Sequence, residues 1–220
     1  MKKKGRYKAT GVEVELETGS MGKVLKNLLG IKNQAELDRV ESIALKQAED
    51  KFQKLVHKDK YFTIKNICNM HKLWLGNIYE WAGQYRNVDL EKGGFRFAHA
   101  KHIPQLMIDF EKNYLTKHTP CIFSGERLIQ ALAEVHVEFV LVHPFREGNG
   151  RLARALSTLM VLQAGLPPLD FTPIEKGKSK QTYFHAVQAG MERNYEPMKK
   201  VFRKIIEKGL SRSREKDKSK

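Results

Sequence analysis

The chain has 220 residues, of which 41% are hydrophobic and 30% are charged, an ordinary composition for a soluble globular protein of one domain. It contains no apolar run of about 18 residues, so no membrane-spanning helix is predicted, and no apolar stretch follows the basic N-terminus as in a secretory signal peptide. The formal net charge of +15 indicates an acidic partner such as a nucleotide, a nucleic acid or an acidic protein.

Two cysteines, Cys68 and Cys121, lie far apart in the sequence. A disulfide scaffold would need more cysteines at closer spacing. We therefore expect both to be reduced residues of the core in a cytoplasmic protein.

Hydrophobic periodicity predicts that the chain is almost entirely helical. In chain order, the expected helices cover residues 34–54, 63–78, 103–116, 124–142, 150–164, 178–192 and 197–210. Residues 84–98 differ from this pattern, because they alternate weakly around the turn residues Lys92, Gly93 and Gly94. This segment predicts a small β-hairpin on a helical body.

Two of the expected helices, residues 128–142 and 152–162, have few polar positions. A helix that is apolar nearly all round belongs in the centre of a bundle. The loop that joins them, residues 143–150, is polar and rich in glycine. A polar loop between two buried helices predicts a functional site.

The second half of this loop has the features of a phosphate-binding site. Gly148, Asn149 and Gly150 lie at the start of a helix, where unpaired N–H groups and the positive end of the helix dipole attract anions. Arg151 and Arg154 are three residues apart, so they share one helix face, and each can bind phosphate oxygens with its guanidinium.

Two further side chains of the loop indicate chemistry on the bound phosphates. Glu147 places a carboxylate beside the anion site, which is favourable if Mg²⁺ lies between the carboxylate and the phosphates. His143 can accept a proton from an attacking hydroxyl near neutral pH. Each feature alone has an ordinary structural explanation, but together they predict a base, a metal ligand and a phosphate clamp.

Residues 143–154 read H-P-F-R-E-G-N-G-R-L-A-R and match the Fic motif, H-x-F-x-(D or E)-G-N-G-R-x-x-R, at every specified position. Residues 80–86 and 93–98 resemble the Fic flap and the segment before it, and residues 24–31 resemble the N-terminal stretch of many Fic enzymes. The resemblance implies an all-α Fic fold, a helical bundle with a central helix–loop–helix active site and a β-hairpin flap. It also implies an N-terminal extension at 1–19, a Fic domain at 20–208 and a basic tail at 209–220.

The resemblance assigns a role to each part of the site. His143 would be the general base and Glu147 the Mg²⁺ ligand, while the flap would align the target segment by strand addition. The α- and β-phosphates would bind Gly148, Asn149 and Gly150, and the β- and γ-phosphates would bind Arg151 and Arg154. Further nucleotide contacts are implied for Gly94 and Phe95 of the flap and, around the adenine, for Tyr183, Phe184 and Met191. Core packing of an amphipathic helix is the alternative for these last three residues.

A Fic enzyme of this kind transfers AMP from Mg-ATP to a Tyr, Ser or Thr hydroxyl of a target protein. Some relatives transfer other phosphate-containing groups, but the kinase-like variant departs from the Gly-Asn-Gly segment that this chain keeps. The alternative from another class is a nucleic-acid-binding module that uses the basic C-terminal end, although it leaves the loop unexplained. That end can equally be a solvated helix face followed by a frayed tail.

Many Fic enzymes are restrained by a helix with the pattern (S or T)-x-x-x-E-(G or N), whose glutamate pairs with the second arginine, here Arg154. The nearest match, residues 211–216, has the wrong last residue and is interpreted as chance. Resemblance to the short bacterial Fic toxins therefore implies a separate small antitoxin, with a subunit of a type II topoisomerase as a candidate target.

Overall fold

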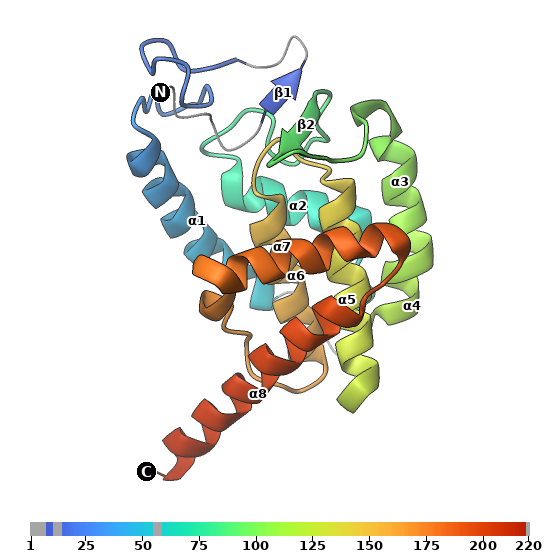
Figure 1. Ribbon diagram of the computed structural model, residues 1–220. Helices are drawn as coiled ribbons and strands as arrows, with labels where there is room; N and C mark the ends of the chain where they lie inside the picture. Colours follow the sequence, from blue (N-terminus) through green and yellow to red (C-terminus); the bar gives the residue numbers. More distant parts are fainter. Residues whose placement is uncertain (1–7, 11–14, 55–58, 219–220) are drawn as a thin grey trace. The chain divides into compact units, whose positions relative to one another are not determined.

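The computed structural model describes residues 8–10, 15–54 and 59–218, with side chains described for 15–54 and 59–210. The described residues form two compact units, one drawn from 8–10, 15–54, 64–108 and 142–149 and the other from 59–63, 109–141 and 150–218. Figure 1 shows the elements in chain order, and helices dominate, as the sequence predicts. No helix in the described part of the chain is long and apolar enough to cross a membrane.

In the first unit, helices α1 and α2 are joined through a buried glutamate. Helix α1 covers Gln34–Lys54, as predicted, and α2 covers Ile64–Leu75. The indole of Trp74 donates a hydrogen bond to the backbone oxygen of Glu41 at 2.9 Å, and the hydroxyl of Tyr79 donates to the Glu41 carboxylate. These bonds fix the position of Trp74, which contacts the loop described below.

Helix α2 ends before the predicted end at Ile78. Gly76 and Asn77 follow Leu75, and both have low helix propensity. The carbonyl of Leu75 then accepts hydrogen bonds from the backbone N–H groups of Ile78 and Tyr79, both at 2.9 Å, which closes the last turn.

The predicted hairpin is present, and a third strand extends it. Strand β2 covers Asp89–Lys92 and β3 covers Phe95–Arg96, and the turn residues Gly93 and Gly94 have φ of 60° and 84°. Positive φ at both positions is the geometry of a two-residue hairpin turn and explains why glycine stands there. Strand β1, Lys8–Thr10, pairs antiparallel with β2, so the sheet order is β1-β2-β3. One edge of the predicted hairpin is therefore covered.

A long helical run follows the hairpin. It begins with the 3₁₀ turn η1 and ends beyond the predicted residue 116, and five of its residues form a wider π-helical segment. Its parts are η1 at Ala100–His102, α3 at Ile103–Phe110, the π segment η2 at Glu111–Leu115 and α4 at Thr116–His118.

The two strongly apolar helices are α5, Gly125–Val142, and α6, Asn149–Gln163. Residues 131–137 of α5 are all buried, and most of α6 is buried as well. The sequence prediction that these helices are central is confirmed for the units to which they belong. The loop of interest runs directly from the end of α5 to the first residue of α6.

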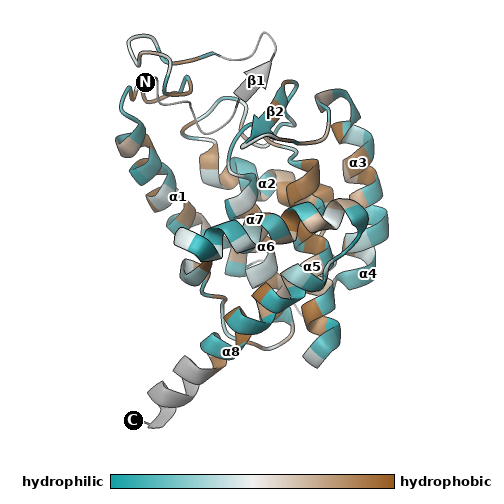
Figure 2. Ribbon diagram, in the orientation of Figure 1, coloured by the Kyte–Doolittle hydropathy of each residue, from teal (hydrophilic) through white to brown (hydrophobic). Residues whose placement is uncertain are grey.

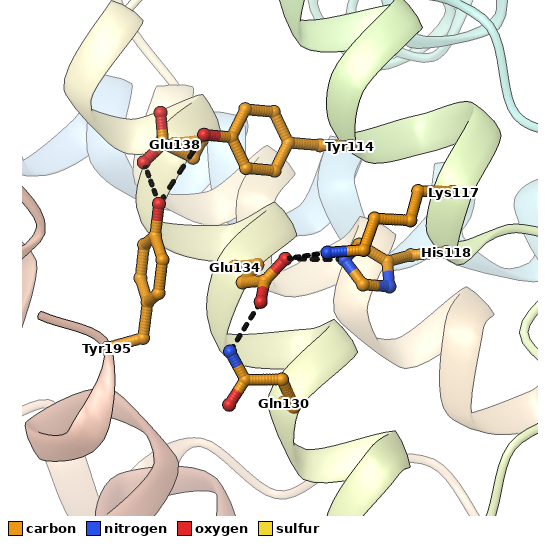
Figure 3. A network of polar contacts seen from close by, with 7 residues as sticks. All are labelled: Tyr114, Lys117, His118, Gln130, Glu134, Glu138 and Tyr195. Carbon is orange, nitrogen blue, oxygen red and sulfur yellow. Dashed lines mark hydrogen bonds and ion pairs between the residues drawn. The ribbon is translucent and has the colours of Figure 1, made fainter. Parts of the chain in front are cut away.

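Two glutamates of α5 are held by polar partners (Figure 3). The carboxylate of Glu134 accepts hydrogen bonds from His118 at 2.6 Å, from Lys117 at 3.1 Å and from Gln130. Burial alone raises the pKa of Glu134, but these hydrogen bonds outweigh it and lower the pKa to about 2.

The second of these glutamates, Glu138, has a different environment. Its pKa is raised, mainly by burial, although it accepts a hydrogen bond from the hydroxyl of Tyr195 at 2.5 Å. The hydroxyl of Tyr114 lies 3.4 Å from that of Tyr195. Both glutamates thus use their carboxylates to hold neighbouring segments of the second unit.

The C-terminal elements are the 3₁₀ turn η3 at Thr172–Ile174, helix α7 at Gly177–Ala189, the 3₁₀ turn η4 at Gly190–Glu192 and helix α8 at Glu196–Lys218. Helix α8 continues beyond the predicted end at residue 210, because no proline or glycine follows to stop it. The near-match at 211–216 lies where side chains are not described. Hydrophilic residues cover much of α7 in Figure 2.

Part of the basic surface of α8 is neutralised within the chain. Lys199 and Arg203 both pair with Glu126, at 2.7 Å and 2.8 Å. Lys199 also pairs with Glu196 of its own helix at 2.7 Å. These pairs favour the interpretation of a solvated helix face for the described part of α8.

Both cysteines carry free thiols. Cys121 is buried, as expected, whereas Cys68 is only half-buried. Burial raises the pKa of both thiols, that of Cys121 to about 11, so neither is a reactive thiolate at neutral pH.

Candidate active site

The loop between α5 and α6 is closed by one side chain. The amide nitrogen of Asn149 donates to the backbone oxygen of Phe145 at 2.7 Å, and its amide oxygen accepts from the Phe145 N–H at 2.8 Å. Both Phe145 and Asn149 are fully buried, so Phe145 anchors the loop in the core. The side chain of Asn149 therefore shapes the loop, so any contact of this residue with phosphate falls to its backbone N–H.

Gly148 occupies a position that only glycine fits. Its φ is 85°, and a Cβ there would lie 2.7 Å from Cζ3 of Trp74. Its N–H donates a hydrogen bond to Oε1 of Glu147 at 2.9 Å. In this structure the Gly148 amide is thus paired with the carboxylate beside it, and a phosphate would compete for that amide.

A buried histidine of α2, which sequence reasoning missed, holds the middle of the loop. His71 accepts a hydrogen bond from the Gly83 N–H on Nδ1 at 2.8 Å, so its Nε2 carries the proton and donates to the Glu147 backbone oxygen at 3.0 Å. Its ring stacks on Phe145 with centroids 3.9 Å apart. No local motif marks this residue, because its role depends on contacts distant in sequence.

His143, the expected base, lies at the beginning of the loop in an unusual backbone conformation. Its φ is 52°, in the left-handed region that residues other than glycine seldom adopt. Its ring stacks on Phe97 of the flap segment with centroids 3.7 Å apart, and only 3% of the residue is exposed. The structure thus brings the flap segment and the histidine together, as the resemblance implies.

The expected phosphate-binding arginines lie on the first turns of α6. Arg151 and Arg154 are partly exposed on a helix whose neighbouring positions are buried. A guanidinium nitrogen of Arg154 lies 3.8 Å from Oε1 of Glu175, a weak ion pair at the protein surface. A Cβ added at Gly150 would meet no atom within 4 Å, so space exists beside the first turn of the helix.

Of the three residues expected around an adenine, Tyr183 belongs to the core. It is 6% exposed, and its hydroxyl lies 2.9 Å from Nε2 of the fully buried His136. Burial, with a smaller effect of Arg154, lowers the pKa of His136 to about 3, so this ring is neutral and structural. Tyr183 is thus packed in the core of the second unit, and its contact with an adenine stays a prediction.

The other expected nucleotide contacts lie at the surface or at the flap. Phe184 is 36% exposed beside Tyr183, and Met191 is 65% exposed. Gly94 stands in the exposed hairpin turn, and Phe95 packs edge-on against Phe97 with centroids 5.3 Å apart. Their contacts with a nucleotide stay a prediction.

The residues of the loop can hold a magnesium ion only if most of its ligands come from outside the protein. Among residues with described side chains, no group of three or more His, Cys, Asp and Glu could hold a metal ion. Glu147 offers a single, 7% exposed carboxylate. A lone carboxylate suits Mg²⁺ that takes its other ligands from phosphate oxygens and water.

The family model described as Fic/DOC matches residues 61–161, a range that includes α2, the hairpin, α5, the loop and most of α6. The chain contains a Fic domain. The matched range contains His143, Glu147 and both arginines of α6, so the Fic loop is the part of the chain that carries the family motif.

Two curated relatives of this Fic chain are named as adenylyltransferases. It is 32% identical over 164 residues to the protein adenylyltransferase VbhT of Bartonella schoenbuchensis, which covers 73% of the chain but 32% of VbhT. It is 29% identical over 190 residues to the probable protein adenylyltransferase Fic of Salmonella typhimurium, covering 83% of the chain and 88% of that protein. The chain thus spans about a third of VbhT and most of the Salmonella protein.

A solved structure confirms the predicted fold. The crystal structure of BepC, a VirB-translocated effector protein of Bartonella tribocorum with bound AMPPNP, matches with a TM-score of 0.70 and 25% sequence identity. The match covers 86% of this Fic chain and 94% of the BepC chain. The all-α Fic fold with a small sheet is therefore confirmed.

Proposed function

We propose that the chain is a protein adenylyltransferase, which transfers AMP from Mg-ATP to a Tyr, Ser or Thr hydroxyl of another protein. One observation carries the proposal: a buried loop bearing His143 and Glu147 leads directly into a helix whose first turns present Arg151 and Arg154. The relatives named as adenylyltransferases and the AMPPNP-bound structure support it.

The proposed reaction is a displacement at the α-phosphorus of ATP. The oxygen of the target hydroxyl forms a bond to the α-phosphorus, and the bond from that phosphorus to the bridging oxygen of the β-phosphate breaks. Pyrophosphate leaves with the electron pair. His143 accepts the proton of the hydroxyl as the new bond forms.

The remaining residues stabilise the charge that develops on the phosphate oxygens. The N–H groups at the start of α6 and the guanidinium groups of Arg151 and Arg154 are donors that the helix holds in place. Glu147 would hold Mg²⁺, which neutralises phosphate charge when bound. The buried loop limits access of water to the reacting atoms.

The target segment would add to the sheet at strand β3. Addition of a target strand to the flap needs an unoccupied sheet edge, and the outer edge of β2 is already paired with β1. Strand β1 lies within residues 1–19, before the catalytic domain that we place at 20–208. The N-terminal extension thus contributes to the flap sheet.

We also propose that a separate small antitoxin restrains the enzyme in the cytoplasm, and that a subunit of a type II topoisomerase is a candidate target. The support is that the sequence lacks the inhibitory glutamate pattern while it keeps the complete loop. Expression of the chain alone should slow cell growth. Normal growth at a high level of active protein would contradict the need for such a partner.

The decisive test supplies the purified chain with Mg²⁺, a cell lysate and ATP labelled with ³²P at either the α- or the γ-position. We expect the α-label, and not the γ-label, on a discrete protein band. Glu147→Ala should weaken the signal, because the Mg²⁺ ligand is lost, while Glu36→Ala, an exposed glutamate of α1, should not.

Two outcomes would contradict the proposed reaction. Transfer of the γ-label would indicate a kinase-type reaction. Absence of both labels, together with DNA binding that falls steeply with salt, would favour the nucleic-acid-binding alternative.

A further inference from the structure

One buried arginine, Arg86, binds the backbone on both sides of the catalytic histidine. Its Nε donates to the His143 oxygen at 2.7 Å, and its Nη2 lies 3.4 Å from the Val142 oxygen. Its backbone N–H donates to the Pro144 oxygen at 2.8 Å. Three successive carbonyl groups around the left-handed His143 thus accept hydrogen bonds from one residue.

The same guanidinium also binds both ends of the flap hairpin. Its Nη1 donates to the Val88 oxygen, just before β2, and its Nη2 donates to the Ala98 oxygen, just after β3, each at 2.6 Å. A planar guanidinium can serve these acceptors at once because its donors point in fixed directions. Arg86 therefore joins the two strands of the flap to the backbone of His143.

A second contact joins the flap to His143. The Phe97 ring stacks on the His143 ring, and the Phe97 N–H donates to the Leu90 oxygen of β2 at 3.1 Å. The imidazole thus lies against a residue whose backbone is part of the hairpin. Its orientation depends on where the flap is held.

The environment of Arg86 shows that this arrangement is not a solvated surface pair. Arg86 is 4% exposed, and burial lowers the pKa of its guanidinium to about 10, so it still carries its charge at neutral pH. The positive charge of Arg146 also lowers this pKa, and the negative charge of Asp89 raises it. The guanidinium binds the backbone carbonyl groups of Val88, Ala98 and His143, and a lysine could not bind all of them at once.

We infer that Arg86 is a positioning residue for the transfer of AMP: it fixes the flap and the imidazole of His143 in one relative position, so that a hydroxyl presented by the flap meets the base. This inference rests on the proposed function. The hydrogen bonds of Arg86 hold the backbone around His143 and the two ends of the flap, whereas the phosphates are assigned to Arg151 and Arg154, so we expect the affinity for ATP not to depend on Arg86.

The test compares Arg86→Lys and Arg86→Gln with the original chain, using labelled ATP and the lysate band as acceptor. We expect kcat to fall by about 10²-fold in both variants, as for a misplaced reacting group, with KM for ATP unchanged. Arg39→Gln is the matched control, because Arg39 is an exposed arginine of α1, outside the flap and the loop. Its kcat should equal that of the original chain.

Two results would overturn the inference: a variant of Arg86 with unchanged kcat, or a fall in ATP affinity as large as the fall in kcat. If the original chain itself transfers no AMP, the proposed function is wrong. That outcome differs from a failure of the inference on Arg86, which requires an active original chain.

Amide hydrogen exchange of the original chain gives a second measurement that needs no variant. The backbone N–H groups of Arg86 and Phe97 should exchange at the same rate through one opening event. The reason is that the Arg86 guanidinium joins the loop at His143 to both ends of the flap. Independent exchange of these two amides would also overturn the inference.

Discussion

Replacing His143 with alanine should lower kcat for AMP transfer by about 10²–10⁴-fold, the range that a positioned general base contributes. Affinity for ATP should be retained, since the described ring contact of His143 is with Phe97 of the flap segment and not with the arginines of α6. The rate is measured with α-labelled ATP, and affinity by titration with a fluorescent ATP analogue.

The matched control for this variant is His185→Ala, because His185 is an exposed histidine of α7 outside the loop. It should transfer AMP at the original rate. If His143→Ala keeps full kcat, another group accepts the proton and the assignment of the base is wrong.

Gly148→Ala should impair both stability and nucleotide binding. The added methyl group would lie 2.7 Å and 2.9 Å from two carbon atoms of the Trp74 indole, at a φ of 85° that alanine adopts with strain. Backbone strain and overpacking together should lower the free energy of unfolding by on the order of 2–4 kcal/mol. Urea unfolding and ATP titration measure the two effects.

Gly150→Ala should change nucleotide binding without lowering the stability of the fold. A methyl group there meets no protein atom within 4 Å, and alanine is the better helix former, so the free energy of unfolding should stay constant or rise slightly. Affinity for ATP should nevertheless fall if phosphates occupy that space. A Gly148→Ala chain as stable as the original, or a Gly150→Ala chain with full ATP affinity, would contradict this account of the loop.

The parts of the fold that periodicity and turn chemistry determine were predictable. Helices α1, α5 and α6 lie where apolar spacing places them, because each buries one or more apolar faces. The hairpin turn at Gly93 and Gly94 was predictable because its backbone requires positive φ. The loop stood out because its polar residues interrupt two buried helices.

The features that the sequence did not indicate depend on contacts distant along the chain. Strand β1 has three residues, too few for a recognisable alternation, and its pairing with β2 joins segments about 80 positions apart. His71 lies in an ordinary-looking helix, and Arg86 lies in a segment that resembles the family without any indicated role, so only the folded chain brings these two residues to the loop. Tyr183 was ambiguous because an amphipathic helix gives an aromatic residue either a core or a binding role.

The side chain of Asn149 shows a finer limit of sequence reasoning. Its place in a Gly-Asn-Gly turn at a helix start indicates phosphate binding, yet its amide is used to close the loop on Phe145. The side chain of Asn149 therefore has a structural role, which sequence spacing alone does not separate from the predicted binding of phosphate.

The direction in which ATP lies along the loop and α6 decides which group of ATP is transferred. A crystal structure with Mg²⁺ and an ATP analogue whose α–β bridging oxygen is replaced by carbon tests it directly. We expect the α-phosphorus beside the His143 imidazole, the β- and γ-phosphates at Arg151 and Arg154, and the metal ion at Glu147. A triphosphate bound in the reverse direction, with its γ-phosphorus beside His143, would contradict transfer of AMP.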